Sequence, residues 1–72
     1  MTAYKRFTDY LWENGISLEF LMDALNPMDV SFMETTIKMM KMCNDDVFYN
    51  VAIDITERTL SDIEMRNSAY GI

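Results

Sequence analysis

Apolar residues in this chain recur at intervals of three and four, the spacing that places side chains on one face of an α-helix. Residues that start or stop helices divide the pattern into four segments. We expect helices over residues 3–14, 18–25, 32–43 and 46–68. The sequence therefore predicts an all-α fold, a small bundle of three to four helices in a single domain that covers residues 1–72.

The first two segments have clear ends. Thr2 is a candidate N-cap of the first helix, and Asn14-Gly15 is a helix-ending pair. Ser17 is a candidate N-cap of the second helix, which Pro27 ends because the residue before a proline disfavours helix. Each segment carries one apolar stripe: Ala3, Tyr4, Phe7, Tyr10 and Leu11 in the first, and Leu18, Leu21, Met22 and Leu25 in the second.

The third segment has two possible starts. Ser31 and Glu34 form a capping box that would open a helix at residue 32, while Asn26 followed by Pro27 offers an earlier start. The segment is apolar over more than half of its circumference, so we expect this helix to be the buried central one. Its apolar residues are Phe32, Met33, Ile37, Met39, Met40, Met42 and Cys43.

The fourth segment is ambiguous at its start, because alternating apolar residues from Val47 to Ile55 also fit a strand. We expect a helix, since a strand would have no partner in this chain and the helical pattern continues to Ile63. A second capping box, Ser61 to Glu64, would allow a break near Ser61. The expected polar face consists of Asp46, Asn50, Asp54, Glu57, Ser61, Glu64 and Ser68.

Three further features of the fourth segment are expected. Asp54–Arg58 and Asp62–Arg66 have the spacing of ion pairs along a helix. Residues 69–72 are expected to fray. A second apolar arc, beyond what a 72-residue core needs, consists of Val47, Val51, Met65 and Ala69.

Composition narrows the function classes. The chain has no His, one Cys and two Gly, so it lacks a nucleophile–base pair, a zinc-binding cluster and a glycine-rich phosphate loop. We expect no enzyme activity, no cofactor and no metal. Cys43 is expected to act as a small core residue, and Asn44-Asp45-Asp46 as a helix cap. With no disulfide to support so short a chain, oligomerisation or a partner is the remaining source of extra stability.

The chain is acidic, with 12 Asp and Glu against 6 Lys and Arg, a net charge of −6. This balance argues against direct nucleic-acid binding, which needs a basic surface. Acidity serves solubility in many proteins, and here it can also attract a basic partner. The chain shows no secretory signal and no membrane span, and one unpaired Cys fits a reducing compartment, so we expect a cytoplasmic protein.

Candidate partner-binding residues are exposed-looking carboxylates and two aromatic residues outside the apolar stripes. The aromatic pair is interpreted either as interface anchors or as side chains that pack on a second helix. The eight Met residues fill a core or line an adaptable binding face. The predicted binding set is Asp9, Trp12, Glu13, Glu19, Phe20, Asp23, Asp54, Glu57 and Glu64.

Two hypotheses of function follow. The first is a small acidic helical protein that binds and inhibits or modulates a larger, basic, nucleic-acid-handling protein. In composition alone, the chain is similar in general character to small phage- or plasmid-encoded inhibitors of host defence or transcription enzymes. The second is a self-associating structural or adaptor domain, a homodimer that uses the second apolar arc of the fourth helix.

Overall fold

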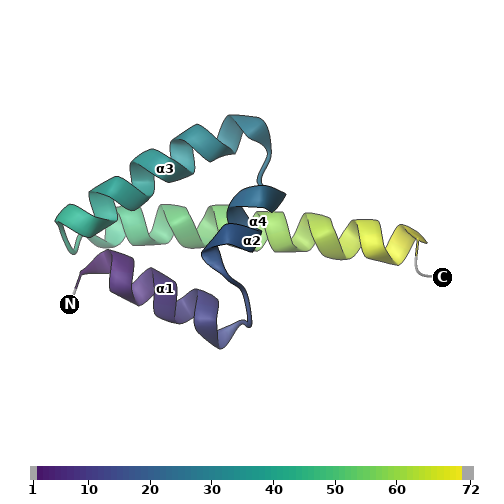
Figure 1. Cartoon of the computed structure of the whole chain (residues 1–72), viewed down its shortest axis with the longest axis horizontal. Helices are drawn as coiled ribbons and strands as arrows, with labels where there is room; N and C mark the ends of the chain where they lie inside the picture. The colour runs from purple at the N-terminus through teal and green to yellow at the C-terminus, as the bar shows by residue number, and fades with distance from the viewer. Residues whose placement is uncertain (1, 71–72) are drawn as a thin grey trace.

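The structure is a computed structural model that describes the backbone of residues 2–70 and the side chains of residues 2–66. It contains four helices, α1 (Ala3–Glu13), α2 (Leu18–Ala24), α3 (Pro27–Met42) and α4 (Asp46–Tyr70), and no strand within the described residues (Figure 1). The predicted all-α fold is confirmed. Residues 47–55, which also fitted a strand, are helical.

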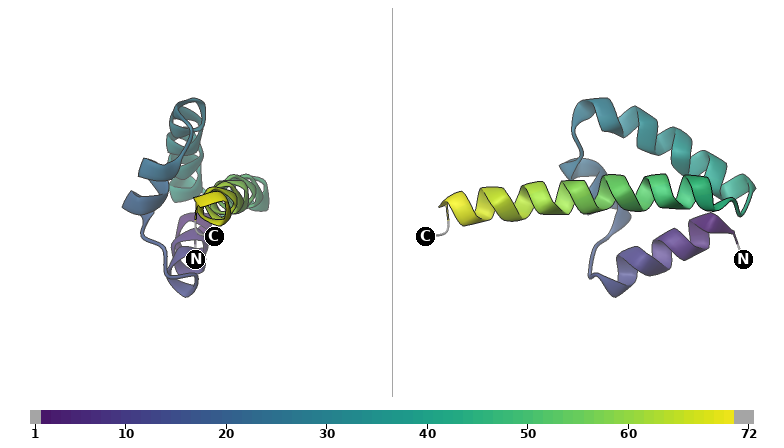
Figure 2. Two further views of the ribbon diagram at one scale, coloured as in Figure 1. Left: turned by 90° about the vertical axis from the view of Figure 1, so that its right-hand side faces the viewer. Right: turned by 180° about the vertical axis from the view of Figure 1, so that it is seen from behind.

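The longest helix, α4, is the axis of the molecule. α1 and α3 lie along its N-terminal half, and α2 crosses it further along (Figure 1). The C-terminal turns of α4 project past the other three helices, as Figure 1 and the right view of Figure 2 show. The molecule is therefore elongated, with extents of 44 × 26 × 18 Å.

The expectation that the third helix would be the buried central one is wrong, because α4 takes that position. Only Met33, Thr36 and Met40 of α3 are buried, whereas Phe32 and Met42 are exposed. The apolar arc of α3 is wider than the surface that its neighbours cover. A broad apolar arc therefore indicates only that a helix is suited to burial on most sides. Which sides are buried depends on where the neighbouring helices lie.

The core lies between α1, α3 and the N-terminal half of α4, with a contribution from α2. Three buried threonines are part of it, and each hydroxyl donates to the carbonyl one turn earlier: Thr36 to Phe32 at 2.9 Å, Thr56 to Ala52 at 2.8 Å and Thr59 to Ile55 at 2.9 Å. Burial therefore leaves no hydroxyl of these residues unpaired. The buried apolar residues are Ala3, Phe7, Leu11, Leu21, Leu25, Met33, Met40, Ala52 and Ile55.

The first two helices begin at their predicted caps. The hydroxyl of Thr2 accepts from the Lys5 amide at 3.3 Å, and that of Ser17 accepts from the Phe20 amide at 3.0 Å. Gly15 follows the end of α1 and has a φ of 69°, a left-handed conformation that glycine adopts easily. It turns the chain away from the axis of α1, so that residues 14–17 lead into α2.

The third helix begins at Pro27 and not at residue 32. Asn26 is its cap, since its side-chain oxygen accepts from the Met28 amide at 3.1 Å. Pro27 occupies the first helical position, where the missing N–H has no cost. Ser31 then lies inside the helix, so the capping box with Glu34 does not form.

The fourth helix begins at the predicted cap and runs without a break. Asp45 provides its cap, with Oδ1 accepting from the Val47 amide at 2.9 Å. The helix continues through Ser61, so the break expected there is absent. The fraying predicted for residues 69–72 is not seen at 69 and 70, which are helical, and residues 71–72 lie outside the described part of the chain.

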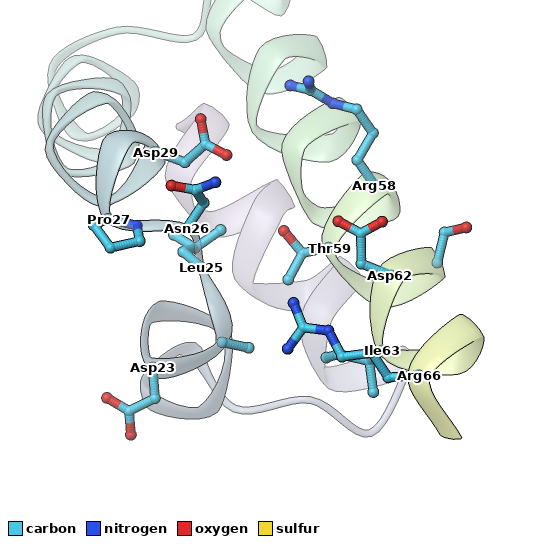
Figure 3. Close-up of a pocket in the computed structure, with 12 residues that line it drawn as sticks. Asp23, Leu25, Asn26, Pro27, Asp29, Arg58, Thr59, Asp62, Ile63 and Arg66 are labelled. Carbon is cyan, nitrogen blue, oxygen red and sulfur yellow. The ribbon is translucent and has the colours of Figure 1, made fainter. Parts of the chain in front are cut away.

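Of the two ion pairs predicted on α4, Asp54–Arg58 forms, at 3.5 Å. Asp62–Arg66 is not among the ion pairs of the described side chains. Figure 3 shows Arg66 reaching from α4 across a groove toward α2 instead.

The start of α1 is fixed to the turn between α3 and α4. The Arg6 guanidinium lies 2.6 Å from Asp46, 3.3 Å from the side-chain oxygen of Asn44 and 4.4 Å above the ring of Tyr49. Cys43 is half-buried at the end of α3, and its carbonyl accepts from the Ala3 amide at 3.4 Å. Cys43 is thus at the edge of the core and not within it.

Candidate partner-binding surface

Two aromatic side chains are exposed at the corner where α1 turns into α2. Trp12, near the end of α1, is 85% exposed, and Phe20, in the first turn of α2, is 52% exposed. Trp12 lines a shallow pocket of about 390 Å³ with Gly15, Ile16 and Ser17 of the connection. Trp12 therefore packs on no second helix, and Phe20 keeps half of its surface open.

Helix geometry explains why these aromatics are outside the core. In α1, Phe7 and Leu11 are buried and therefore fix the inward face. Trp12 lies one residue beyond Leu11, about 100° around the helix. In α2, Leu21 is the buried residue and Phe20 precedes it, so the second aromatic is also turned away from the inward face.

Three of the predicted carboxylates belong to the same corner. Glu13 follows Trp12 in the chain, Glu19 precedes Phe20, and Asp23 lies one turn further along α2. All three are exposed, and none forms an ion pair within 4.0 Å with the side chains that the structure describes. We call Trp12, Glu13, Glu19, Phe20 and Asp23 the acidic corner.

A second group of carboxylates follows the outer face of α4. Asp46, Asp54, Glu57 and Glu64 are all exposed, which confirms the predicted polar face as far as Glu64. The side chain of Ser68 lies outside the described part. From Asp46 to Glu64 this row is about 27 Å long at 1.5 Å per residue. Two of its members, Asp46 and Asp54, already pair with arginines of the chain.

Asp9 lies apart from both groups. It is half-buried on α1 and pairs with Lys5 at 2.7 Å, so its charge is already balanced. The structure therefore divides the predicted binding set into the acidic corner, the α4 row and an isolated Asp9.

Tyr10 lies at the seam between α1 and α4. Partial burial raises the pKa of its phenol, and the nearby charge of Glu57 raises it further. The phenol therefore stays neutral at physiological pH. Glu13 follows Arg6 and Tyr10 on the same flank of α1, so its carboxylate lies on the side of α1 that meets α4.

A groove of about 710 Å³ separates the α2–α3 joint from α4 (Figure 3). Asp23 and Asp29 line one side, and Arg58, Asp62 and Arg66 line the other. In Figure 3 the Asp23 carboxylate points away from the groove, while the Arg66 guanidinium reaches into it. Sequence reasoning missed this groove, because its two walls are more than 25 residues apart in the chain and no local pattern connects them.

Sequence reasoning also placed exposed residues of α3 in the core. Phe32 and Met42 belonged to the expected apolar arc and are exposed. Met28, which lay outside the expected helix, is exposed too, and the three share one side of α3 with Thr35 and Met39. The alternating spacing of four and three from residue 28 to residue 42 was the available signal. It marks a second stripe, separate from the buried Met33, Thr36 and Met40.

The described residues contain no cluster of three or more His, Cys, Asp or Glu side chains that could hold a metal ion. None of the described helices is long and apolar enough to cross a membrane. A comparison of the chain with protein-family models, with curated proteins and with solved structures finds no match in any of the three.

Proposed function

We propose that this protein acts by binding, and that it attaches through the acidic corner to a larger protein with a basic surface, whose activity it inhibits or modulates. The observation that carries the proposal is the exposed Trp12 at the end of α1, together with the exposed Glu13, Glu19 and Asp23 of the same stretch of chain, which form no ion pair with the described side chains. Aromatic side chains of this kind act as anchors at the centres of protein interfaces.

The chemistry of the corner favours a basic partner. One arginine of the partner can stack on the indole of Trp12, and other basic side chains of the partner can pair with Glu13 and Glu19. The carboxylates on the outer face of α4 extend the negative surface, which raises the rate of encounter with a positive one. Proteins that handle nucleic acids present such basic surfaces, and they are the proposed class of target.

The two kinds of residue in the corner have different expected roles. Trp12 and Phe20 would hold the complex together, so their loss would increase the dissociation rate. Glu13, Glu19 and Asp23 would mainly speed association, and their effect would weaken as salt screens it.

The test is affinity capture from a lysate of the organism that encodes the chain, with identification by mass spectrometry. The baits are the wild type, Trp12→Ala, and a triple charge reversal of Glu13, Glu19 and Asp23 to Lys. Met65→Ala is the matched control, because Met65 is exposed on α4 outside the corner. We expect one basic protein to be lost from the first two variants and retained by the control.

Binding kinetics with the captured protein then separate the roles. Trp12→Ala should increase the dissociation rate about tenfold or more. The charge reversal should slow association and flatten its salt dependence. Unchanged kinetics in both variants would contradict the proposal and would leave the acidity of the corner as a solubility feature.

A further inference from the structure

The outer side of α3 carries an apolar stripe that no other part of the described chain covers. Met28 is 84% exposed, Phe32 55% and Met42 73%, and Met39 between them is half-buried. At 100° per residue these side chains and Thr35 fall within an arc of about 80°. We call Met28, Phe32, Thr35, Met39 and Met42 the outer stripe.

The residues of the outer stripe are spaced as they are on helices that pair side by side. Its members follow one another at steps of four, three, four and three, the repeat that keeps a seam facing a second helix. A row of Met and Phe at these positions buries well against a similar row, because Met adapts its shape to its neighbour.

Charge selects the partner. α3 contains two acidic residues, Asp29 and Glu34, and two basic residues, Lys38 and Lys41, so the helix is neutral. The rest of the chain holds the remaining ten acidic and four basic residues, a net charge of −6. Two copies of this chain repel each other over most of their surfaces. α1 is also neutral, with Lys5 and Arg6 against Asp9 and Glu13, but among the described side chains only α3 combines neutrality with an exposed row of apolar residues, so two copies can meet there without added repulsion.

The order of the charges along α3 also fits a second copy in one orientation. Its acidic residues are in the N-terminal half and its basic residues in the C-terminal half. An antiparallel pair about a two-fold axis near Thr35 places Met28 of each copy opposite Met42 of the other, and Phe32 within one residue of Met39. Glu34 of each copy then lies on the same flank as Lys38 of the other, two residues out of exact register, an offset of about 3 Å that their long side chains can span.

We propose that two copies of this protein associate through the outer stripes of α3, packed antiparallel across a two-fold axis near Thr35. This interface does not use the acidic corner, so either proposal can fail without the other. α3 is about 24 Å long at 1.5 Å per residue, and one helix face makes a small interface. We therefore expect a weak dimer with a dissociation constant in the micromolar range.

Sedimentation equilibrium over micromolar concentrations tests the interface. Phe32→Glu and Met28→Glu should each weaken the dimer about tenfold or more, because a two-fold interface contains every substitution twice. Met65→Glu is the matched control, since Met65 is 68% exposed on α4, and it should leave dimerisation unchanged. Circular dichroism confirms that each variant is folded.

A charge exchange tests the pairing of Glu34 with Lys38. Glu34→Lys alone places two lysines on the same flank, and Lys38→Glu alone places two glutamates there. Each single variant should weaken the dimer, and the double variant should restore it. A double variant no better than the singles would contradict the proposed register.

Cysteine cross-linking tests the orientation in a Cys43→Ser background, which removes the native thiol. Thr35→Cys should form a disulfide-linked dimer under mild oxidation, because each residue 35 meets its own copy at the axis. Met28→Cys should not, because its neighbour across an antiparallel interface is Met42. Efficient cross-linking of both variants would indicate parallel helices and would overturn the proposed orientation.

Two results would overturn the interface itself. One is a wild-type protein that stays monomeric up to about 1 mM, a concentration that would populate even a very weak dimer. The other is a dimer that Phe32→Glu and Met28→Glu leave unchanged. A monomeric Phe32→Glu that still captures the basic partner through Trp12 would support this inference and the proposed function independently.

Discussion

Arg6 shows how much one side chain contributes to a small fold. It lies on α1, yet its guanidinium contacts Asn44 in the turn before α4 and both Asp46 and Tyr49 in the first turns of α4. Residues about 40 positions apart in the chain are thereby held together. The Arg6 side chain is 34% exposed and the Asp46 side chain is 70% exposed, so the ion pair by itself is largely solvated. Arg6 contributes more than a lone surface pair because it also contacts Asn44 and the ring of Tyr49.

We predict that Arg6→Ala lowers the free energy of unfolding by about 1–2 kcal/mol, because the ion pair and the contact with the Tyr49 ring are lost together. Lys5→Ala is the control. It removes only the exposed pair with Asp9 and should cost no more than about 0.5 kcal/mol. Urea unfolding followed by circular dichroism measures both. Equal effects would mean that the Arg6 contacts are no stronger than a surface pair.

The methionines show at the same scale that residue type does not decide burial. Met33 and Met40 are fully buried in α3, while Met28 and Met42 of the same helix are exposed. Met33, Met40 and Met42 belong to the same expected apolar arc, and Met28 precedes the expected start of that helix. Position relative to α1 and α4 separates them.

At the scale of the helix, the beginning of α3 was the least certain boundary. Two signals competed, Asn26 with Pro27 and Ser31 with Glu34, and the earlier one forms. An N-cap must precede the helix, so the earlier start leaves Ser31 inside it. The earlier start also gives α3 the length to carry both a buried face and the outer stripe.

We predict that Asn26→Ala lowers the free energy of unfolding by about 1 kcal/mol, because the Met28 amide loses its side-chain acceptor. Ser31→Ala, the control at the unused start, should change it by less than about 0.5 kcal/mol. Thermal and urea unfolding compare the two variants. A larger loss from Ser31→Ala would mean that the helix begins at residue 32 in solution.

Charge is the dominant feature at the scale of the whole molecule. A net charge of −6 is carried by a molecule whose largest extent is 44 Å, so most carboxylates lie within a few Debye lengths of one another at low salt. Three ion pairs offset part of this repulsion among the described side chains. Self-repulsion of this kind destabilises a compact state.

We predict that the protein becomes more stable as NaCl rises from about 10 mM to about 0.5 M, because screening reduces the net repulsion more than it weakens the ion pairs. The midpoint of thermal unfolding measures the effect at one protein concentration, since dimerisation also shifts the midpoint. A variant with Glu57 and Glu64 changed to Gln should respond less to salt. A midpoint that falls with salt would show that the ion pairs outweigh the repulsion.

The sequence by itself determined the helical class, a count of three to four helices and most of the helix ends. These features depend on interactions within a few residues: the spacing of apolar side chains, the caps at Thr2 and Ser17, and the stops at Gly15 and Pro27. It also determined that Trp12 and Phe20 lie outside the stripes of their own helices. It could not determine whether a neighbouring helix covers them.

Tertiary structure alone decided which apolar faces are covered. α4 became the axis because it is long enough to contact the other three helices, and α3 was left with an uncovered stripe. The groove between the α2–α3 joint and α4 and the cluster around Arg6 join residues that are distant in the chain. Such contacts depend on how the helices pack against each other, and the local pattern of a sequence carries no direct record of that packing.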